Sequence, residues 1–334
     1  MRAIRFILWA AAWLVLSICI LWTIGALDFD FPIASFRPFA GIGFTILILL
    51  AIFFARGKTR KLFVVLGAFL VVLAWWRIAL KPSNNRSWQP DVAETAWAEI
   101  NGDDVTIHNV RNCEYRTETD YTARWETRAV KLSQITGIDL AITYWGSPYI
   151  AHPIASFQFA DAPPLCFSIE ARKEVGESYS AIGGFYRQYE LIYICSDERD
   201  VIRLRTNYRH GEDVYLYHVV NSPAQARERF LEYLKTLNTL HSTPRWYNAV
   251  TTNCTTAIRA QHPTNERTPW DWRILVNGKG DELLYERKLI ATAGLSFADL
   301  KQLSHINERA RAADQDPDFS HRIREGLPGY SQGR

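Results

Sequence analysis

This chain of 334 residues contains too little cysteine, glycine and proline to belong to several classes of protein. Five cysteines are too few for a small domain held together by disulfides. Eighteen glycines and 14 prolines exclude a collagen-like repeat. Charge is nearly absent between residues 6 and 55, where only Asp28, Asp30 and Arg37 carry it. The overall hydrophobic content of 48% excludes intrinsic disorder.

The sequence also lacks the patterns of nucleotide, metal and nucleic-acid binding. Gly278-Lys279-Gly280 has neither the earlier glycine nor the following Ser or Thr of a phosphate loop. Cys254 and His262 have no second pair of ligands, so we predict no metal site and no cofactor. Residues 1–81 hold nine Lys and Arg against two Asp, a net +7, which leaves −4 on the remaining 253 residues. Because a nucleic-acid-binding protein carries its positive excess on the globular part, we expect no nucleic-acid partner.

Three apolar segments predict transmembrane helices over about residues 6–27, 39–55 and 62–80. The first has 22 uncharged residues, which is enough to cross a hydrocarbon core of about 30 Å at about 1.5 Å per residue. The third contains Arg77, and a buried or interfacial helix is the alternative for it. A cleaved signal peptide would leave two of the segments unexplained. Cys19 does not fit a lipoprotein signal, because Ile18 before it is too bulky.

The basic residues predict the orientation of these helices. Arg2 and Arg5 precede the first segment, and four basic residues separate the second from the third: Arg56, Lys58, Arg60 and Lys61. Positive residues favour the cytoplasmic side. We therefore expect a multi-pass protein of the bacterial inner membrane, with a cytoplasmic N-terminus and a periplasmic C-terminal part.

The rest of the chain predicts an α+β domain. We expect a membrane region over 1–81, a juxtamembrane linker over 82–100, an extracytoplasmic domain over 101–319 and a disordered tail over 320–334. Alternating or continuous apolar residues predict strands at 105–110, 150–159, 165–170, 191–195 and 214–220. Ser222-Pro223 and the amphipathic run after it predict a helix. Strands without regular helical crossovers favour an antiparallel sheet.

Cys254 is the first candidate for chemistry. It follows Thr251-Thr252-Asn253, and Thr and Asn are residues that begin helices, so Cys254 is predicted in the first turn of a helix. Free backbone N–H groups there would lower the pKa of the thiol and could bind an oxyanion. The alternative is a structural cysteine near a helix cap.

His152 is the best candidate for a base that activates the cysteine. It opens a strand in which alternation puts Ser156 on the same face. A hairpin centred on Asp161 would place Glu170 of the next strand directly opposite, about 5 Å away between Cβ atoms. The alternative is a cross-strand pair at the surface, and Pro153 can force a bulge that shifts the register.

Over about residues 100–285 the chain resembles the periplasmic domain family named after Lnb, a lipoprotein N-acyltransferase of Gram-positive bacteria. The stretches that carry the resemblance are RNCEYRTETDYTARWE (111–126), YWGSPYIAHPIASFQF (144–159), SIEARKEVGESYS (168–180), YICSDERDVIRLRTNYR (193–209), EDVYLY (212–217) and RWYNAVTTNCTT (245–256). The family in turn is similar to circularly permuted papain-like thiol enzymes of the lecithin-retinol-acyltransferase type. Their order of His, orienting polar residue and Cys matches His152, Glu170 and Cys254.

The resemblance implies an acyl-thioester on Cys254, with His152 as general base and Glu170 as its orienting partner. It also implies that Asn253, Arg172, Glu174 and Tyr247 contact substrate or support the site. Lnb-like enzymes move an acyl chain from the diacylglyceryl group of a lipoprotein to its N-terminal amine, so membrane lipid or lipoprotein is the implied substrate. The stretch at 197–200 (DERD) also matches the family, and we interpret it as a buried ion-pair network.

Two other functions fit the same residues. The triad would equally serve an envelope cysteine peptidase or amidase, and the domain could instead be a catalytically silent binding module. Cys113, Cys166 and Cys195 form an odd set outside the membrane segments, which allows one disulfide or none.

The predicted topology can be tested at the C-terminus. A reporter fused after Arg334 is expected to give a periplasmic signal, because three spans carry the chain from the cytoplasm to the outer side. Alkaline phosphatase and green fluorescent protein fusions measure the two locations independently. A cytoplasmic signal would overturn the three-span topology.

Overall fold

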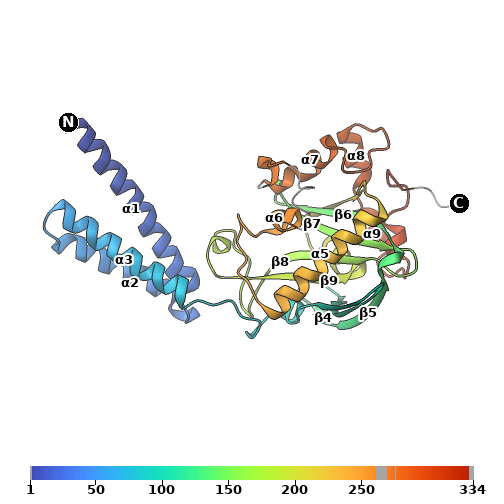
Figure 1. Ribbon diagram of the computed structural model, residues 1–334, viewed down its shortest axis with the longest axis horizontal. Coiled ribbons are helices and arrows are strands. Elements are labelled where there is room, and N and C mark those ends of the chain that lie inside the picture. The colour runs from blue at the N-terminus through green and yellow to red at the C-terminus, as the bar shows by residue number, and fades with distance from the viewer. Residues whose placement is uncertain (1, 261–268, 275, 331–334) are drawn as a thin grey trace. The chain divides into compact units, whose positions relative to one another are not determined.

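The computed structural model describes residues 2–260, 269–274 and 276–330. The chain forms two compact units. Unit 1 contains Met1–Ser83 and Ser178–Glu190, and unit 2 contains Asn84–Glu177 and Leu191–Arg334. Figure 1 shows the long helices of unit 1 and the mixed helices and strands of unit 2.

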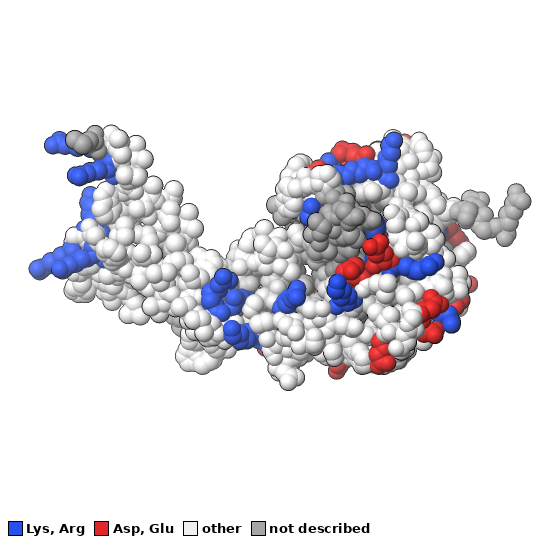
Figure 2. Space-filling model, viewed as in Figure 1, with Lys and Arg blue, Asp and Glu red and all other residues white. Residues whose placement is uncertain are grey.

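Unit 1 contains the three predicted membrane helices. They are α1 (Arg2–Asp30), α2 (Arg37–Phe54) and α3 (Lys58–Ile78), with a short 3-10 turn η1 (Ala34–Phe36) before α2. All three are long and apolar enough to cross a membrane. Figure 2 shows this helical part as largely white, with Lys and Arg gathered at the left of the view and no acidic residue in view. The predicted spans are confirmed, with boundaries that differ by a few residues.

Segment Ser178–Glu190 packs on the C-terminal ends of α1 and α3 within unit 1. The Arg187 backbone N–H donates to both carboxylate oxygens of Asp30 at 3.1 and 3.0 Å. The Arg187 guanidinium donates to the carbonyls of Trp76 at 2.6 Å and Leu80 at 2.9 Å, and lies 4.1 Å from the Trp76 ring centre. Trp76 Nε1 donates to Asp30 at 2.5 Å. These contacts satisfy the polar groups at the ends of two apolar helices.

Unit 2 is built on an eight-stranded, mostly antiparallel sheet. Its order is β1-β2-β9-β8-β7-β6-β10, with β5 paired to β2 and one parallel contact between β2 and β9. The strands are β1 (Trp97–Asn101), β2 (Asp104–Arg111), β5 (Trp125–Lys131), β6 (Ile135–Trp145), β7 (Ser147–Phe159), β8 (Leu165–Arg172), β9 (Glu190–Asp197) and β10 (Glu212–His218). A separate hairpin pairs β3 (Glu114–Tyr115) with β4 (Tyr121–Thr122). The predicted α+β class is confirmed.

Helices pack on both faces of the sheet. They are α4 (Glu198–Arg203), α5 (Pro223–Ser242), α6 (Cys254–Ala260), α7 (Gly280–Glu286), α8 (Phe297–Ser304), α9 (Asn307–Ala312) and α10 (Phe319–Arg322). The short elements are the π-helix η5 (Leu204–Tyr208) and the 3-10 turns η2 (Pro90–Val92), η3 (Leu132–Gln134), η4 (Gly183–Phe185), η6 (Trp272–Ile274) and η7 (Asn277–Lys279). Helix α5 begins at a capping box, because the side chains and backbone N–H groups of Ser222 and Gln225 bond each other.

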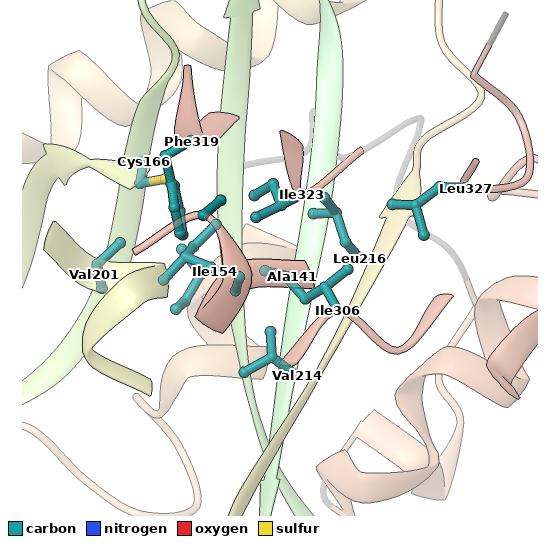
Figure 3. Packing of buried hydrophobic residues seen from close by; sticks show 13 residues of the cluster. Ala141, Ile154, Cys166, Val201, Val214, Leu216, Ile306, Phe319, Ile323 and Leu327 are labelled. Carbon is teal, nitrogen blue, oxygen red and sulfur yellow. The ribbon is translucent and has the colours of Figure 1, made fainter. Parts of the chain in front are cut away.

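Strand β7 separates the two cores of unit 2. Phe157 packs edge-on against Phe230 of α5, with ring centres 5.1 Å apart. Ile154 points the other way, into a cluster with Ala141 of β6 and Phe319 of α10 (Figure 3). Alternation along the strand therefore gives β7 one face toward α5 and one toward α4, α9 and α10.

The C-terminal segment differs from the disorder expected after residue 319. Phe319, Ile323 and Leu327 are buried in the cluster of Figure 3. Arg324 donates to Asp139 at 2.8 Å and to Glu198 at 2.6 Å, both of which are fully buried. The apolar residues recur three or four apart in this stretch, so the chain returns to the sheet despite its Gly and Pro content. Residues 331–334 lie outside the described residues.

The expected linker over 82–100 is also largely part of unit 2. Trp88 and Val92 are buried beside Ile192 and Ile194 of β9, and β1 begins at Trp97. The stretch is polar overall, but the buried side chains of Trp88 and Val92 pack it against the sheet.

The stretch 197–200 forms the buried ion pairs predicted for it. Asp197 accepts from Arg128 at 2.7 Å, and Glu198 pairs with Arg324. Asp200 accepts from Arg111 at 2.7 Å and from the Cys113 backbone N–H at 2.7 Å. Arg111 and Asp200 are 1% and 0% exposed, so neither charge has water to replace its partner.

Loss of one partner in this buried pair is expected to weaken the fold strongly. Arg111→Met leaves the Asp200 carboxylate buried without its counter-ion, and should lower the free energy of unfolding by about 3–5 kcal/mol. Urea titration of the full chain in detergent measures the change. Arg116→Met is the control, because the Arg116–Asp120 pair is exposed at the surface and should leave the titration unchanged. Equal effects of the two substitutions would contradict this account.

Candidate active site

The hairpin of β7 and β8 has the predicted register. Ile154 pairs with Ser168, and the ladder continues through Ala155–Phe167, Ser156–Cys166 and Phe157–Leu165. Pro153 has no backbone N–H, and the pairing ends at Ile154–Ser168, two steps short of His152 and Glu170. The turn chemistry around Asp161 thus brings the polar residues of both strands onto one face.

His152 and Glu170 are joined through a serine that lies between them. The His152 Nε2 lies 2.8 Å from Ser168 Oγ, and Ser168 Oγ donates to Glu170 Oε1 at 2.7 Å. Because the single hydroxyl hydrogen of Ser168 goes to the carboxylate, His152 Nε2 has to be the donor to Ser168. The neutral ring therefore carries its lone pair on Nδ1, which is the nitrogen left to act as a base.

Arg205 of η5 pairs with Glu170, the last member of the hydrogen-bonded series His152, Ser168 and Glu170. Its guanidinium donates to Glu170 at 3.3 Å and to Glu212 at 3.3 Å, and the arginine is 5% exposed. Burial alone would raise the pKa of Glu170, but Arg205, His152 and Arg111 lower it below its usual range. Burial and then the charge of Arg205 lower the pKa of His152 to about 3. At neutral pH the unit is a neutral imidazole backed by an ionised, charge-paired carboxylate.

Cys254 begins α6, as predicted. Asn253 Oδ1 accepts from the Thr256 backbone N–H at 2.9 Å, which is the bond of a helix cap. The thiol is 5% exposed. Its Sγ lies 3.8 Å from Thr255 Oγ1 and 3.8 Å from the side-chain nitrogen of Asn277.

The pKa of Cys254 departs from the sequence-based expectation. Burial raises the pKa of the thiol, and the hydrogen bonds from Thr255 and Asn277 lower it by less. The early position in a short helix does not compensate for the loss of water around the sulfur. The resting residue is a thiol, so a proton has to leave it before it can attack.

Among the described residues, Cys254 and His152 do not form a hydrogen bond with each other. Within the residues described, the bonds of the Cys254 sulfur run to Thr255 and Asn277, and that of the His152 ring runs to Ser168. Alternation directs His152 to the face of Ile154. The link between the two segments is Asn277, whose Oδ1 accepts from the Ala151 backbone N–H at 3.0 Å.

An apolar cavity of about 180 Å³ lies on the opposite face of β7, beside α6. Thr255, next to Cys254, and Asn277 are in its wall. The sheet contributes Ile138, Leu140, Ile142, Pro153, Ala155 and Phe157, and the helices and loops add Tyr233, Ile258, Ile274, Leu283, Leu284 and Leu289. An apolar cavity of about 150 Å³ in another protein stays dry and binds benzene, so this volume suits part of a hydrocarbon chain.

The other predicted residues support the fold around the site. Ser156 donates to Glu198 at 2.5 Å, on the face away from the cavity. Arg172 is buried, donates to the carbonyls of Val92 at 2.9 Å and Ala93 at 2.6 Å, and lies over Trp88. Glu174 pairs with Arg86 at 2.9 Å, and Tyr247 is 7% exposed.

Cys113, Cys166 and Cys195 are buried as free thiols, and His262 lies outside the described residues.

Sequence reasoning missed three residues that the fold brings to the site: Ser168, Arg205 and Asn277. Ser168 shares its strand face with Glu170, so the alternation of β8 could have revealed it. Arg205 and Asn277 come from η5 and η7, far along the chain, and only the tertiary structure reveals their contacts.

Comparison with known protein families found a match. Residues 121–278 match the family model described as the Lnb N-terminal periplasmic domain, which covers His152, Glu170, Cys254 and Asn277. Searches of curated proteins and of solved structures found no match. The papain-like permutation therefore stays a prediction.

The low pKa of His152 predicts a pH dependence of stability. The pKa is about 3 in the folded domain and about 6.5 unfolded, so the unfolded chain binds more protons between these values. The contribution of His152 is complete above pH 6.5 and is lost as the pH falls toward 3. Between pH 7.5 and pH 5 this residue should account for a loss of about 2 kcal/mol, which His152→Gln removes.

Urea titration of the full chain at the two pH values measures this difference. His321→Gln is the matched control, because that side chain is 75% exposed, and it should keep the wild-type dependence. A His152→Gln variant with the wild-type dependence would show that the buried imidazole is not the group that titrates.

Proposed function

We propose that the chain, whose residues 121–278 match the family model described as the Lnb N-terminal periplasmic domain, is a membrane-anchored cysteine acyltransferase. Its substrate is lipid-linked, such as a lipoprotein, and Cys254 carries the acyl chain as a thioester. The observation that carries the proposal is the position of Cys254 beside an apolar cavity. Thr255 and Asn277, the two side chains that bond its sulfur, both line that cavity.

The cavity gives the nucleophile a place to hold hydrocarbon. Its wall is aliphatic and aromatic on the sheet side, and burial of each methylene is worth about 0.8 kcal/mol. A chain bound there would present its carbonyl carbon at the start of α6. The aliphatic wall suits a hydrocarbon chain, and on this ground we favour acyl transfer over peptide hydrolysis.

The reaction has two displacement steps. Sγ of Cys254 attacks the carbonyl carbon of an ester-linked chain, the C–O bond breaks, and the glycerol oxygen leaves with a proton. The amine of the acceptor then attacks the thioester, the C–S bond breaks, and the thiol is restored as the amide forms. His152 Nδ1 accepts the thiol proton in the first step and returns it to the leaving oxygen.

Proton transfer requires that Cys254 and His152 meet. Both are neutral in the resting domain. When they meet, the proton can pass from the thiol to the imidazole, because the thiolate and the imidazolium stabilise each other. Glu170, through Ser168, would support the imidazolium, as the carboxylate does in other triads. Arg205 keeps Glu170 ionised for this role.

The membrane helices anchor the domain, and the contacts within unit 1 support the proposed orientation. Segment Ser178–Glu190, which connects β8 to β9, contacts the C-terminal ends of α1 and α3. Within unit 1, the basic turn between α2 and α3 therefore lies at the opposite end of α3 from this segment. This agrees with a cytoplasmic N-terminus in the inner membrane.

The thioester can be trapped directly. Full-length protein in liposomes that contain a diacylglyceryl lipopeptide with alkyne-tagged chains should acquire a hydroxylamine-sensitive label on the Cys254 peptide. Cys254→Ser should lose that label, whereas Cys195→Ser, at a buried cysteine of β9, should keep it. Label on the acceptor amine measures transfer, and free fatty acid alone would indicate a hydrolase. Label that is unchanged in Cys254→Ser would contradict the proposal.

Substitution of two valines tests, in the same assay, whether the cavity holds the acyl chain. Val220 lines the cavity and is 56% exposed, so Val220→Trp should narrow it without disturbing the core. Val175 is 66% exposed and outside the cavity wall, which makes Val175→Trp the control. We expect at least about a tenfold loss of label for the first variant only. Equal labelling of both would remove the cavity from the mechanism.

A further inference from the structure

The side-chain amide of Asn277 connects strand β7 to the sulfur of Cys254. Its Oδ1 accepts from the Ala151 backbone N–H at 3.0 Å, and its Nδ2 lies 3.8 Å from Cys254 Sγ. The residue opens η7 and lines the apolar cavity. One amide thus contacts the strand that carries His152, the candidate nucleophile and the candidate acyl site.

The two contacts fix which end of the amide faces the sulfur. A backbone N–H can only donate, so the atom of Asn277 that faces Ala151 must be the oxygen. The NH₂ group is then directed at Cys254, where it acts as a donor. The orientation follows from the hydrogen-bond partners alone.

Gly278 holds Asn277 at this position. A Cβ at residue 278 would lie 2.4 Å from the Tyr149 carbonyl carbon, 2.5 Å from the Pro148 oxygen and 2.6 Å from the Ile150 nitrogen. All three are backbone atoms, so the strand cannot yield as a flexible side chain would. The absence of a side chain lets η7 lie against β7 closely enough for Asn277 to reach both partners.

We propose that Asn277 is a catalytic residue, whose Nδ2–H group stabilises the Cys254 thiolate and then the oxyanion of the acyl intermediate. The inference rests on the proposed function, because it takes Cys254 as the nucleophile. A donor that is already oriented needs no rearrangement when charge develops on the sulfur or on the carbonyl oxygen beside it. The resting thiol stays protonated because burial raises its pKa by more than the hydrogen bonds to the sulfur lower it.

Two substitutions separate donation from packing. Asn277→Asp keeps an oxygen acceptor for Ala151 but replaces the donor with a charge that itself opposes a thiolate. Asn277→Leu, which keeps the approximate volume and loses both bonds without adding charge, therefore has to shift the profile too. Asn238 is the matched control, because its amide accepts from the Ala98 N–H at 2.7 Å and donates to the Ala98 carbonyl at 2.8 Å, and the bonds described for the Cys254 sulfur do not include it. Arg259 and Arg273, two charged residues of the cavity wall, are the same in all three variants, so their charges cannot cause a difference between the variants.

The measurement is the rate of iodoacetamide alkylation of Cys254 against pH, read on its peptide by mass spectrometry in the full chain in detergent. A hydrogen bond to a charged group shifts a pKa by about one to two units, so both Asn277 variants should form about 10- to 100-fold less thiolate below the pKa. Asn238→Asp should titrate as the wild type. Far-ultraviolet circular dichroism confirms that each variant is folded.

The outcomes distinguish this inference from the proposed function. A folded Asn277→Asp variant with the wild-type profile overturns the inference, even if Cys254 forms the thioester. If the profile shifts while wild-type Cys254 forms no thioester, the donor role at the sulfur stands and the proposed acyltransferase is wrong. A shift in the Asn238 variant as well would assign the effect to general destabilisation and also overturn the inference.

Discussion

The antiparallel pairing of β7 with β8 is the constraint on which the candidate site depends. Because Ile154 pairs with Ser168, the next polar positions on that face are His152 and Glu170, and Ser168 lies between them as a bridge. A shift of one residue would send these side chains to the opposite face and expose the apolar set that packs on α5. The same register places Pro153, Ala155 and Phe157 in the wall of the cavity. One strand therefore supplies both the candidate base and the surface for an acyl chain.

Much of the fold could be predicted because its signals are local. Charge-free runs of 15 residues or more marked the membrane helices, and Ser222-Pro223 with the amphipathic run after it marked α5. The inner strand β6, next to the edge strand β10, gave no such signal, since it is buried on both faces and its residues do not alternate. The tail after residue 319 was judged by its Gly and Pro content, yet Phe319, Ile323 and Leu327 fill the core. In both places, tertiary packing outweighed the local composition.

The candidate site was predictable only in part, for the same reason. Cys254, His152 and Glu170 stand in short patterns that a sequence displays, whereas Arg205 and Asn277 reach the site from elements far along the chain. The expected low pKa of the thiol was wrong because burial outweighs the hydrogen bonds to the sulfur. Burial likewise keeps His152 neutral. The resting site is thus an uncharged pair, and Asn277 connects the strand of His152 to the sulfur of Cys254.

The claim that matters most is that His152 takes the proton from Cys254. The most direct measurement compares the alkylation rate of Cys254 at pH 7 in the wild type and in His152→Ala, with the full chain embedded in liposomes and saturated with a non-hydrolysable ether lipid that fills the cavity. A positioned general base typically accelerates proton transfer by about 10²-fold or more. The account predicts a loss of that size in His152→Ala. Equal rates in the two proteins would contradict it, and would leave Cys254 without the base that the mechanism requires.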